Sequence, residues 1–330
     1  MSQSVQNPAD KHHYIPQFYT RRWTGEDGLL EIFEKEGAVI SIRRGSPKST
    51  GYQSKLYAME GFEGEKAAAF EKKFFEPADT KAARALQFME KGKHVYSREL
   101  RSAWSRFLMS LLLRCPEDMA VMRAEWDKYL AETDPKLEAY YSSIREEGAP
   151  ATMAEFIESR DEASAQQRMF YTYKTFIDNS RIGNILNNVQ WSVFDLSDSK
   201  HRLLSSDRPL IRGNLGEENG LWSLPISPTL LFMAAKDSRR LNAVLKLSPD
   251  YVVKDTNLRV VERAVRYVYS TDRSQARFIS NRFGKKPEPR LIVGMFQRRP
   301  RIDVGAAIEQ HKRIVARRQA EQDEAKESLN

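Results

Sequence analysis

The spacing of apolar residues changes once along this 330-residue chain, and that change limits the folds open to it. From about 65 to 187, apolar residues recur every three to four positions, which is typical of helices that pack through one face. From about 188 to 300 the period falls toward two, which indicates strands. Because the two patterns are segregated, we predict an α+β fold rather than a repeated strand–helix–strand unit.

The helical half carries several boundary signals. Pro77 is expected to end a first helix that starts near Glu65, and a second helix is expected from about Thr80 to Glu90. Ser97 is a candidate cap for a third helix. Pro116 is expected to stop that helix and to open the next one.

The rest of the chain predicts mainly strands. Residues 29–42, with Glu36-Gly37 at the turn, fit a hairpin that follows a short helix begun by Pro16. A single basic helix, capped by Thr256, is expected among the later strands. Those strands, which could form an antiparallel or mixed sheet, are expected near 193–196, 202–205, 221–226, 230–233 and 290–296.

The length suits one large domain or two smaller ones. We expect a single domain over 11–305, with its helical part at about 65–187 and its strand-rich part at about 188–300. Residues 1–10 are polar and are expected to be disordered, and 306–330 to form a polar helix or tail.

Composition limits the environment. One cysteine excludes an internal disulfide framework, and the start of the chain lacks the apolar core of a signal peptide. The strongest apolar run, at 108–113, is far shorter than the ~20 residues of a membrane span. These features predict a cytoplasmic protein that does not enter a membrane.

The positive charge is concentrated near the end of the chain. Residues 257–300 contain eleven Lys or Arg and three Asp or Glu, a surplus equal to the whole net charge of +8. On the predicted helix, Arg259, Arg263 and Arg266 share one side, which fits contact with nucleic acid or another anionic ligand. A solvated helix face is the structural alternative.

The first candidate site is the segment His12-His13-Tyr14-Ile15-Pro16-Gln17. Neighbours in an extended segment point to opposite sides, so the two histidines are not expected to bind one metal together. Either imidazole is a candidate general base or ligand, with Tyr14, Gln17 and Arg21 as candidate substrate contacts. The alternative is that these residues fasten the start of the chain to the core.

The second candidate site is Ser206-Asp207-Arg208-Pro209, at the end of a predicted strand. Asp207 could orient a histidine or hold a divalent cation, and Ser206 could contact substrate. The alternative is a local turn in which Asp207 accepts hydrogen bonds from nearby backbone. Common nucleotide-binding and hydrolase motifs are absent, and the triplet Asp79-Thr80-Lys81 does not lie on a convincing strand.

The segment HHYIPQFYTRRWT resembles the opening of a mainly bacterial family known as domain of unknown function 4238. The corner at 206–209 and the turn PISP at 225–228 resemble later motifs of the same family, over about 11 to 280. Both Arg21 and Arg22 fit the family's arginine. The resemblance implies recurring roles for the positions His12, His13, Tyr14, Pro16, Gln17, Ser206, Asp207 and Pro209, but no activity.

Two functions follow as hypotheses, and a third possibility is a purely structural or assembly protein joined through the helical layer or the polar C-terminal helix. In the first, His12 or His13 meets Asp207 in one cavity, and the chain hydrolyses an anionic substrate, with a phosphodiester as one version. In the second, the chain is a binding module for nucleic acid or protein, and both motifs serve only the fold. A divalent cation and the oligomeric state are left open.

Overall fold

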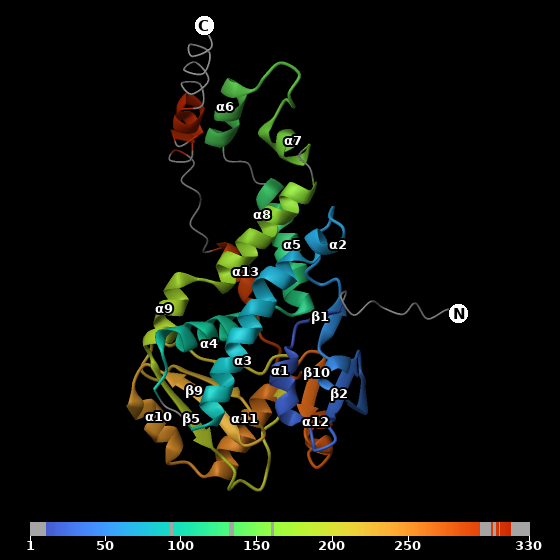
Figure 1. Ribbon diagram of the computed structural model, residues 1–330, viewed down its shortest axis with the longest axis vertical. Helices are drawn as coiled ribbons and strands as arrows, with labels where there is room; N and C mark the ends of the chain where they lie inside the picture. The colour runs from blue at the N-terminus through green and yellow to red at the C-terminus, as the bar shows by residue number, and fades with distance from the viewer. Residues whose placement is uncertain are drawn as a thin grey trace, which may run out of the picture.

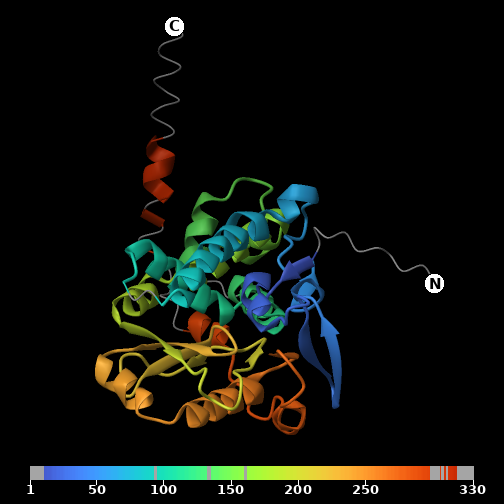
Figure 2. The ribbon, with the colours of Figure 1, turned by 60° about the horizontal axis from the view of Figure 1, so that its bottom comes forward.

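A computed structural model describes residues 11–92, 95–131, 135–159, 162–297, 305, 308–309 and 311–317 (Figure 1). The fold is α+β, as predicted, with small antiparallel sheets covered by helices (Figure 2). The strands are β1 (Lys11–His13), β2 (Leu30–Glu36), β3 (Val39–Gly45), β4 (Tyr52–Ser54), β5 (Gln190–Asp195), β6 (Ser205–Ser206), β7 (Ile211–Arg212), β8 (Leu221–Pro225), β9 (Leu230–Ala235) and β10 (Tyr267–Ser270).

Helices form the larger part of the described chain. The α-helices are α1 (Gln17–Thr20), α2 (Gly64–Ala67), α3 (Glu76–Glu90), α4 (Arg98–Leu111), α5 (Pro116–Ala131), α6 (Pro135–Ile144), α7 (Met153–Glu158), α8 (Glu162–Ile177), α9 (Ser180–Asn188), α10 (Ser238–Leu245), α11 (Pro249–Arg263), α12 (Ala276–Arg282) and α13 (Leu291–Gln297). The short turns are the 3-10 turns η2 (Arg21–Trp23) and η3 (Pro47–Ser49) and the π-helical turn η4 (Glu71–Phe75).

The sheets join distant parts of the chain. One sheet has the order β3-β2-β10-β6, a second has β5-β9-β8-β7, and β1 pairs with β4. All of these pairings are antiparallel. In the first sheet Val268 lies opposite Phe33 on one side and Ser206 on the other. The predicted hairpin β2–β3 is therefore confirmed, but it shares its sheet with strands more than 150 residues later.

The second sheet is covered on both faces. Phe232 of β9 faces the helical layer, where its ring meets Trp104 of α4 at 5.6 Å between centroids. Its neighbours Leu231 and Met233 point the other way and pack with Leu241 of α10. This alternation is the two-residue period that the sequence displays. Figure 2 shows α10 and α11 beneath the sheet and the helical layer above it.

Pro77 does not end a helix, contrary to the prediction. The π-helical turn η4 runs directly into α3, and Pro77 occupies the first turn of α3. Proline is tolerated there because the amide it lacks has no helical partner at that position. The prediction was wrong because a proline by itself does not tell the end of one helix from the beginning of another.

Two later predictions also need correction. Residues 290–296 were expected to form a strand, but 291–297 form α13, which packs on α5 and buries Ile292. A short run that is apolar on all sides has no period to separate strand from buried helix. The basic helix α11 starts at Pro249, where Ser248 accepts the N–H of Tyr251 at 3.3 Å, and not at Thr256.

The predicted strand at 202–205 is in fact only the two-residue β6. The helices α10 and α12 were not predicted. The strand-rich half therefore contains more helices than the single one expected. By contrast, Ser97 caps α4 as predicted, accepting the N–H of Leu100 at 3.2 Å. Pro116 opens α5, also as predicted.

One large cluster of buried side chains connects the helical layer to both main sheets. It includes Trp23, Trp104, Leu224 and Tyr269, and the fully buried Arg114 lies beside it. Among the described residues no helix is both long enough and apolar enough to cross a bilayer.

The ends of the chain are described only in part. The predicted disorder of 1–10 lies outside the described residues. Within the predicted polar tail, 308–309 and 311–317 are helical, and His311 meets the Tyr140 hydroxyl of α6 at 2.9 Å. Figure 1 shows this segment beside α6 at one end of the molecule.

Candidate active site

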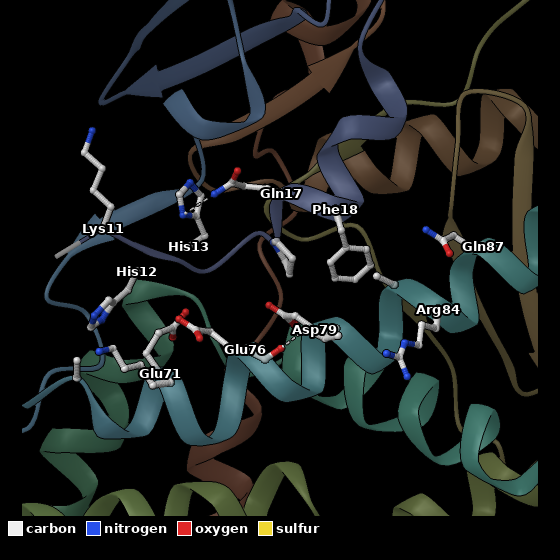
Figure 3. Close-up of a pocket in the computed structure, with 15 residues that line it drawn as sticks. Lys11, His12, His13, Gln17, Phe18, Glu71, Glu76, Asp79, Arg84 and Gln87 are labelled. Carbon is white, nitrogen blue, oxygen red and sulfur yellow. Dashed lines mark hydrogen bonds between the residues drawn. The ribbon is translucent and has the colours of Figure 1, made fainter. Parts of the chain in front are cut away.

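An open cavity of about 760 Å³ lies between the start of the chain and α3. One wall is formed by β1 and α1, and the other by η4 and α3 (Figure 3). Its titratable lining comprises Lys11, His12, His13, Glu71, Lys72, Glu76, Asp79 and Arg84. The volume is typical of a site for a small ligand or part of a polymer.

His13 contributes a half-buried imidazole to this cavity. Its Nδ1 lies 3.4 Å from the amide nitrogen of Gln17, which can donate a hydrogen bond to it. Its Nε2 is buried and has no hydrogen-bond partner. Burial lowers the pKa of His13 below its ordinary value, and the positive charge of Arg114 adds to that effect, while the nearby backbone of Lys48 and Lys11 opposes it. The ring is therefore neutral at pH 7, with a lone pair on Nδ1 that faces Gln17.

His12 is more enclosed than His13. Its ring stacks on Tyr57 with 5.6 Å between centroids, and its Nδ1 accepts the backbone N–H of Tyr57 at 2.9 Å. Figure 3 shows the two imidazoles on different sides of the strand, as alternation requires. The hydrogen bond to Tyr57 links β1 to the segment that leads to α2, which is a structural role for His12.

Glu71 is the acid that stands out in the opposite wall. It lies in η4, and π-helical turns occur frequently at functional sites. Its Oε2 is buried without a hydrogen-bond partner. Burial raises the pKa of Glu71 to about 8, the nearby Asp79 and Glu76 add to the rise, and Arg114 opposes it. Glu71 is therefore mostly protonated at pH 7.

Arg114 holds the two walls of the cavity together. Its guanidinium contacts both carboxylate oxygens of Asp79, at 2.9 and 3.1 Å, and also donates to the His13 carbonyl at 2.9 Å. It lies over the Phe75 ring, with 4.4 Å to the centroid. Because Arg114 is completely buried, this ion pair fixes α3 relative to β1 with little screening by solvent.

The surroundings of the cavity are mildly cationic. Lys11, Lys72 and Arg84 line it against Glu76, while the charge of Asp79 is matched by Arg114 and Glu71 is mostly neutral. Lys72 is itself paired with Glu65 at 3.3 Å, so the surplus of positive charge is small. Such a lining favours an anionic ligand. In the described part of the chain, no group of three or more His, Cys, Asp or Glu residues could hold a metal ion.

Asp207 lies outside this cavity. Its carboxylate is 2% exposed and accepts the backbone N–H groups of Val265 and Arg266 at 2.9 and 2.6 Å. These bonds join the end of β6 to the turn before β10. Asp207 therefore binds backbone that is distant in sequence, and not the nearby backbone of the local turn that was the alternative. The structure does not bring Asp207 together with His12 and His13 as the first hypothesis required.

The companion residues of Asp207 are buried as well. Ser206 donates to the Val260 carbonyl at 3.3 Å and accepts the N–H of Arg208 at 3.0 Å. Tyr14 is 1% exposed and does not line the cavity. Burial raises the pKa of Tyr14, with Tyr269 and Asp207 adding to the rise, so the phenol lies on the side of Asp207.

Gln17 and Arg21 differ in their placement. Gln17 lines the cavity and contacts His13, as described above. Arg21 is exposed in η2 and is not part of the lining, whereas Arg22 forms a bidentate ion pair with Glu90 of α3. Of the predicted substrate contacts near the start of the chain, the cavity therefore includes Gln17 alone.

Many basic residues of the stretch 257–300 are paired with acids, some within the stretch and some from other parts of the chain. Arg266 lies beyond the end of α11, so the three predicted arginines do not share a helix face. Arg298 and Arg299 lie outside the described residues. The ion pairs are Arg259–Asp255, Arg263–Glu288, Arg266–Glu34, Arg273–Glu31, Arg282–Glu262, Lys286–Glu262 and Arg290–Asp118.

The wall formed by η4 and α3 was not predicted as part of a site. Glu76, Thr80, Arg84 and Gln87 line the cavity at spacings of three and four residues, which would place them on one face of a helix. That spacing was the available signal. The sequence around Glu71 contains no such signal, because the raised pKa of Glu71 depends on its burial in the folded protein. Arg114 lies within the apolar run LLLRC, where a lone arginine is itself a signal.

The comparisons with known proteins give one result. No curated protein and no solved structure matches the chain significantly. The family model described as "Protein of unknown function (DUF4238)" matches residues 11–274, which is most of the chain and confirms the resemblance. The chain therefore belongs to the DUF4238 family.

Proposed function

We propose that the cavity between β1 and α3 is the active site of a phosphodiester hydrolase, with His13 as general base and Glu71 as general acid. The observation that carries this proposal is the buried, unpartnered Oε2 of Glu71 in one cavity with the neutral imidazole of His13. Structural carboxyls in a core are normally hydrogen-bonded. A free one in the same cavity as a base fits proton transfer.

The protonation states support this division of roles. At pH 7 His13 can accept a proton at Nδ1, and Glu71 can give one up. The hydrogen bond from Gln17 to Nδ1 is long, at 3.4 Å, so an attacking water can take the place of Gln17 at that lone pair. His13 then takes the proton of that water as its oxygen attacks phosphorus, and Glu71 protonates the leaving oxygen as the bond from phosphorus to it breaks.

The cationic lining supports an anionic substrate. Lys11, Lys72 and Arg84 can attract a phosphodiester and offset the charge that develops on its oxygens. The internal ion pairs of the stretch 257–300 argue against the alternative of a binding module that docks through that stretch. The cavity is therefore the better candidate for an anion-binding surface.

Hydrolysis assays test the proposal directly. Bis(4-nitrophenyl) phosphate, single-stranded RNA and single-stranded DNA are incubated with the wild type and with Glu71→Gln and His13→Asn, with and without Mg²⁺. We expect each variant to lose about 10²- to 10⁴-fold in rate, the usual contribution of a general acid or base. Glu63→Gln, an exposed glutamate outside the cavity, is the matched control.

Cleavage of none of the three substrates by the wild type would contradict the proposal. Equal rates for wild type and Glu71→Gln would do the same. The wild-type kcat/KM is expected to rise with pH as His13 loses its proton and to fall again near pH 8, where Glu71 loses its own.

A further inference from the structure

A second cavity, of about 1150 Å³, lies between the helical layer and the β5-β9-β8-β7 sheet. Its walls come from α4, from the junction of α8 and α9, from β7 and β8, and from the segment 289–297 that includes α13. It shares no lining residue with the candidate active site. Cavities where two layers meet are common ligand sites.

Arg212 of β7 is the unusual residue of this cavity. Its Nε is buried and has no hydrogen-bond partner, and the described residues supply no ion pair for its guanidinium. Arg212 lies opposite Trp222 in the register of β7 and β8, and the Trp222 ring also lines the cavity. A partly buried cation without an acceptor is destabilising unless a bound anion supplies one.

The surroundings of Arg212 strengthen its need for an anion. Burial lowers the pKa of Arg263, Glu288 opposes that effect, and the charges of Arg259 and Arg212 add to it. Arg212 therefore belongs to a cluster of arginines. The acid in the cavity lining, Asp178, is already paired with Arg106 at 2.5 Å and is not available to Arg212.

Two further cations line the same cavity. Arg290 lines it from the segment before α13, although it is also paired with Asp118 at 3.4 Å and with Glu117 at 3.8 Å. Arg181 lies in the first turn of α9, whose N-terminus also borders the cavity and carries a partial positive charge. The cavity lining therefore holds three arginines against one acid, Asp178.

The remaining walls are mainly aliphatic. They consist of Met109 and Leu112 of α4, Phe176 of α8, and Leu291, Val293 and Met295 of α13. Such walls offer no hydrogen bonds. Burial of a hydrocarbon chain against them stabilises the complex by about 0.8 kcal/mol for each buried CH₂. A small inorganic anion would leave these walls uncovered.

We propose that this cavity binds an amphipathic anion, with a carboxylate or phosphate head at Arg212 and an alkyl chain against α4 and α13. The head supplies the acceptor that Arg212 lacks, and the chain covers the aliphatic walls. This site is separate from the hydrolase proposal, and neither depends on the other.

Isothermal titration calorimetry with short amphiphiles tests the proposal. Octyl phosphate and octanoate carry the two candidate heads, octanol lacks a charge, and inorganic phosphate lacks a chain. We expect at least one octyl anion to bind about tenfold or more tightly than octanol and inorganic phosphate, since one charge-assisted hydrogen bond accounts for such a factor. The tighter anion identifies the head group.

Arg212→Gln is expected to weaken that binding by about tenfold or more, for the same reason. The control Arg239→Gln, which changes an exposed arginine of α10, should leave it unchanged. Met295→Asp, which places a negative charge in the aliphatic wall, should weaken binding through the chain. Equal binding of octanol and both anions, or an unchanged affinity in Arg212→Gln, would overturn the proposal.

Thermal unfolding without ligand gives a second readout. Because Arg212 has no acceptor in the described structure, Arg212→Gln should keep or raise Tm. Octyl phosphate or octanoate should raise the Tm of the wild type and not that of the variant. A marked fall of Tm in unliganded Arg212→Gln would show that Arg212 serves the fold, which contradicts the proposal.

Discussion

Arg114 and Asp79 form a two-point ion pair inside the protein, with nitrogen–oxygen distances of 2.9 and 3.1 Å. Arg114 comes from the connection between α4 and α5, and Asp79 from the first turn of α3. The same guanidinium donates to the carbonyl of His13. One buried side chain thus sets the positions of both walls of the candidate active site.

Loss of this ion pair should strongly destabilise the fold. In Arg114→Met the Asp79 carboxylate stays largely buried without its cation, and we expect the free energy of unfolding to fall by about 3 to 5 kcal/mol. Urea denaturation measures the change. Arg106→Gln is the matched control, because its pair with Asp178 is more exposed and should contribute below about 1 kcal/mol. Equal losses in the two variants would contradict the role given to Arg114.

Asp207→Asn should affect folding rather than chemistry. The amide that replaces the carboxylate can accept only one of the two backbone N–H groups that Asp207 now binds. We expect a loss of about 1 to 3 kcal/mol in unfolding free energy, the effect of an unsatisfied buried donor. The pH dependence of hydrolysis should keep its shape. A shifted pH profile of hydrolysis with an unchanged Tm would instead mean that Asp207 takes part in the reaction.

Glu71→Gln should change how stability depends on pH. The folded-state pKa of Glu71, at about 8, is above its ordinary value of 4.5, so the folded protein binds the proton more tightly than the unfolded chain does. Stability from this group is complete below pH 4.5 and is lost as the pH rises to 8, by at most about 1.4 kcal/mol per pH unit. In Glu71→Gln this loss of stability with rising pH should be absent, because the glutamine side chain does not ionise.

Urea denaturation of wild type and Glu71→Gln at pH 5 and pH 8.5 measures the difference. We expect the variant to gain stability relative to the wild type at the higher pH. Parallel behaviour of the two proteins across this range would mean that Glu71 is ionised in the folded state at neutral pH.

The basic residues near the end of the chain should matter mainly for stability. Glu262 is 3% exposed and is paired with Arg282 and Lys286. The double variant Arg282→Gln/Lys286→Gln leaves that carboxylate uncompensated, and we expect a loss of about 1 to 2 kcal/mol, since both partners are half-exposed or more. An unchanged Tm together with weaker binding of generic DNA would favour a docking role instead.

The sequence predicted those elements whose signals are local. Ser97 caps α4, and the hairpin β2–β3 turns at Glu36-Gly37, where Gly37 has φ +60°. The place of β10 in the sheet could not be predicted from local signals, because β10 pairs with a hairpin that lies far from it in the sequence. The prediction of a strand at 290–296 was wrong because this short run is apolar on every side and so has no period that separates helix from strand.

The candidate site was predictable only in part. The paired histidines drew attention to β1, and His13 does line the cavity. The expected partner Asp207 faces the backbone at 265–266 instead, which no sequence pattern indicates. Glu71 is an ordinary glutamate in the sequence, and its raised pKa arises from burial and from neighbours that folding brings close.

The pKa of the Glu71 side chain tests the central claim most directly. Glutamate labelled with ¹³C at the carboxyl carbon is titrated by NMR, and the Glu71 resonance is assigned by its loss in Glu71→Gln. We predict a midpoint near 8, because the carboxyl is buried without a hydrogen-bond partner. A midpoint near the ordinary value of 4.5 would mean that Glu71 carries no proton at pH 7, and it would remove the general acid from the proposed mechanism.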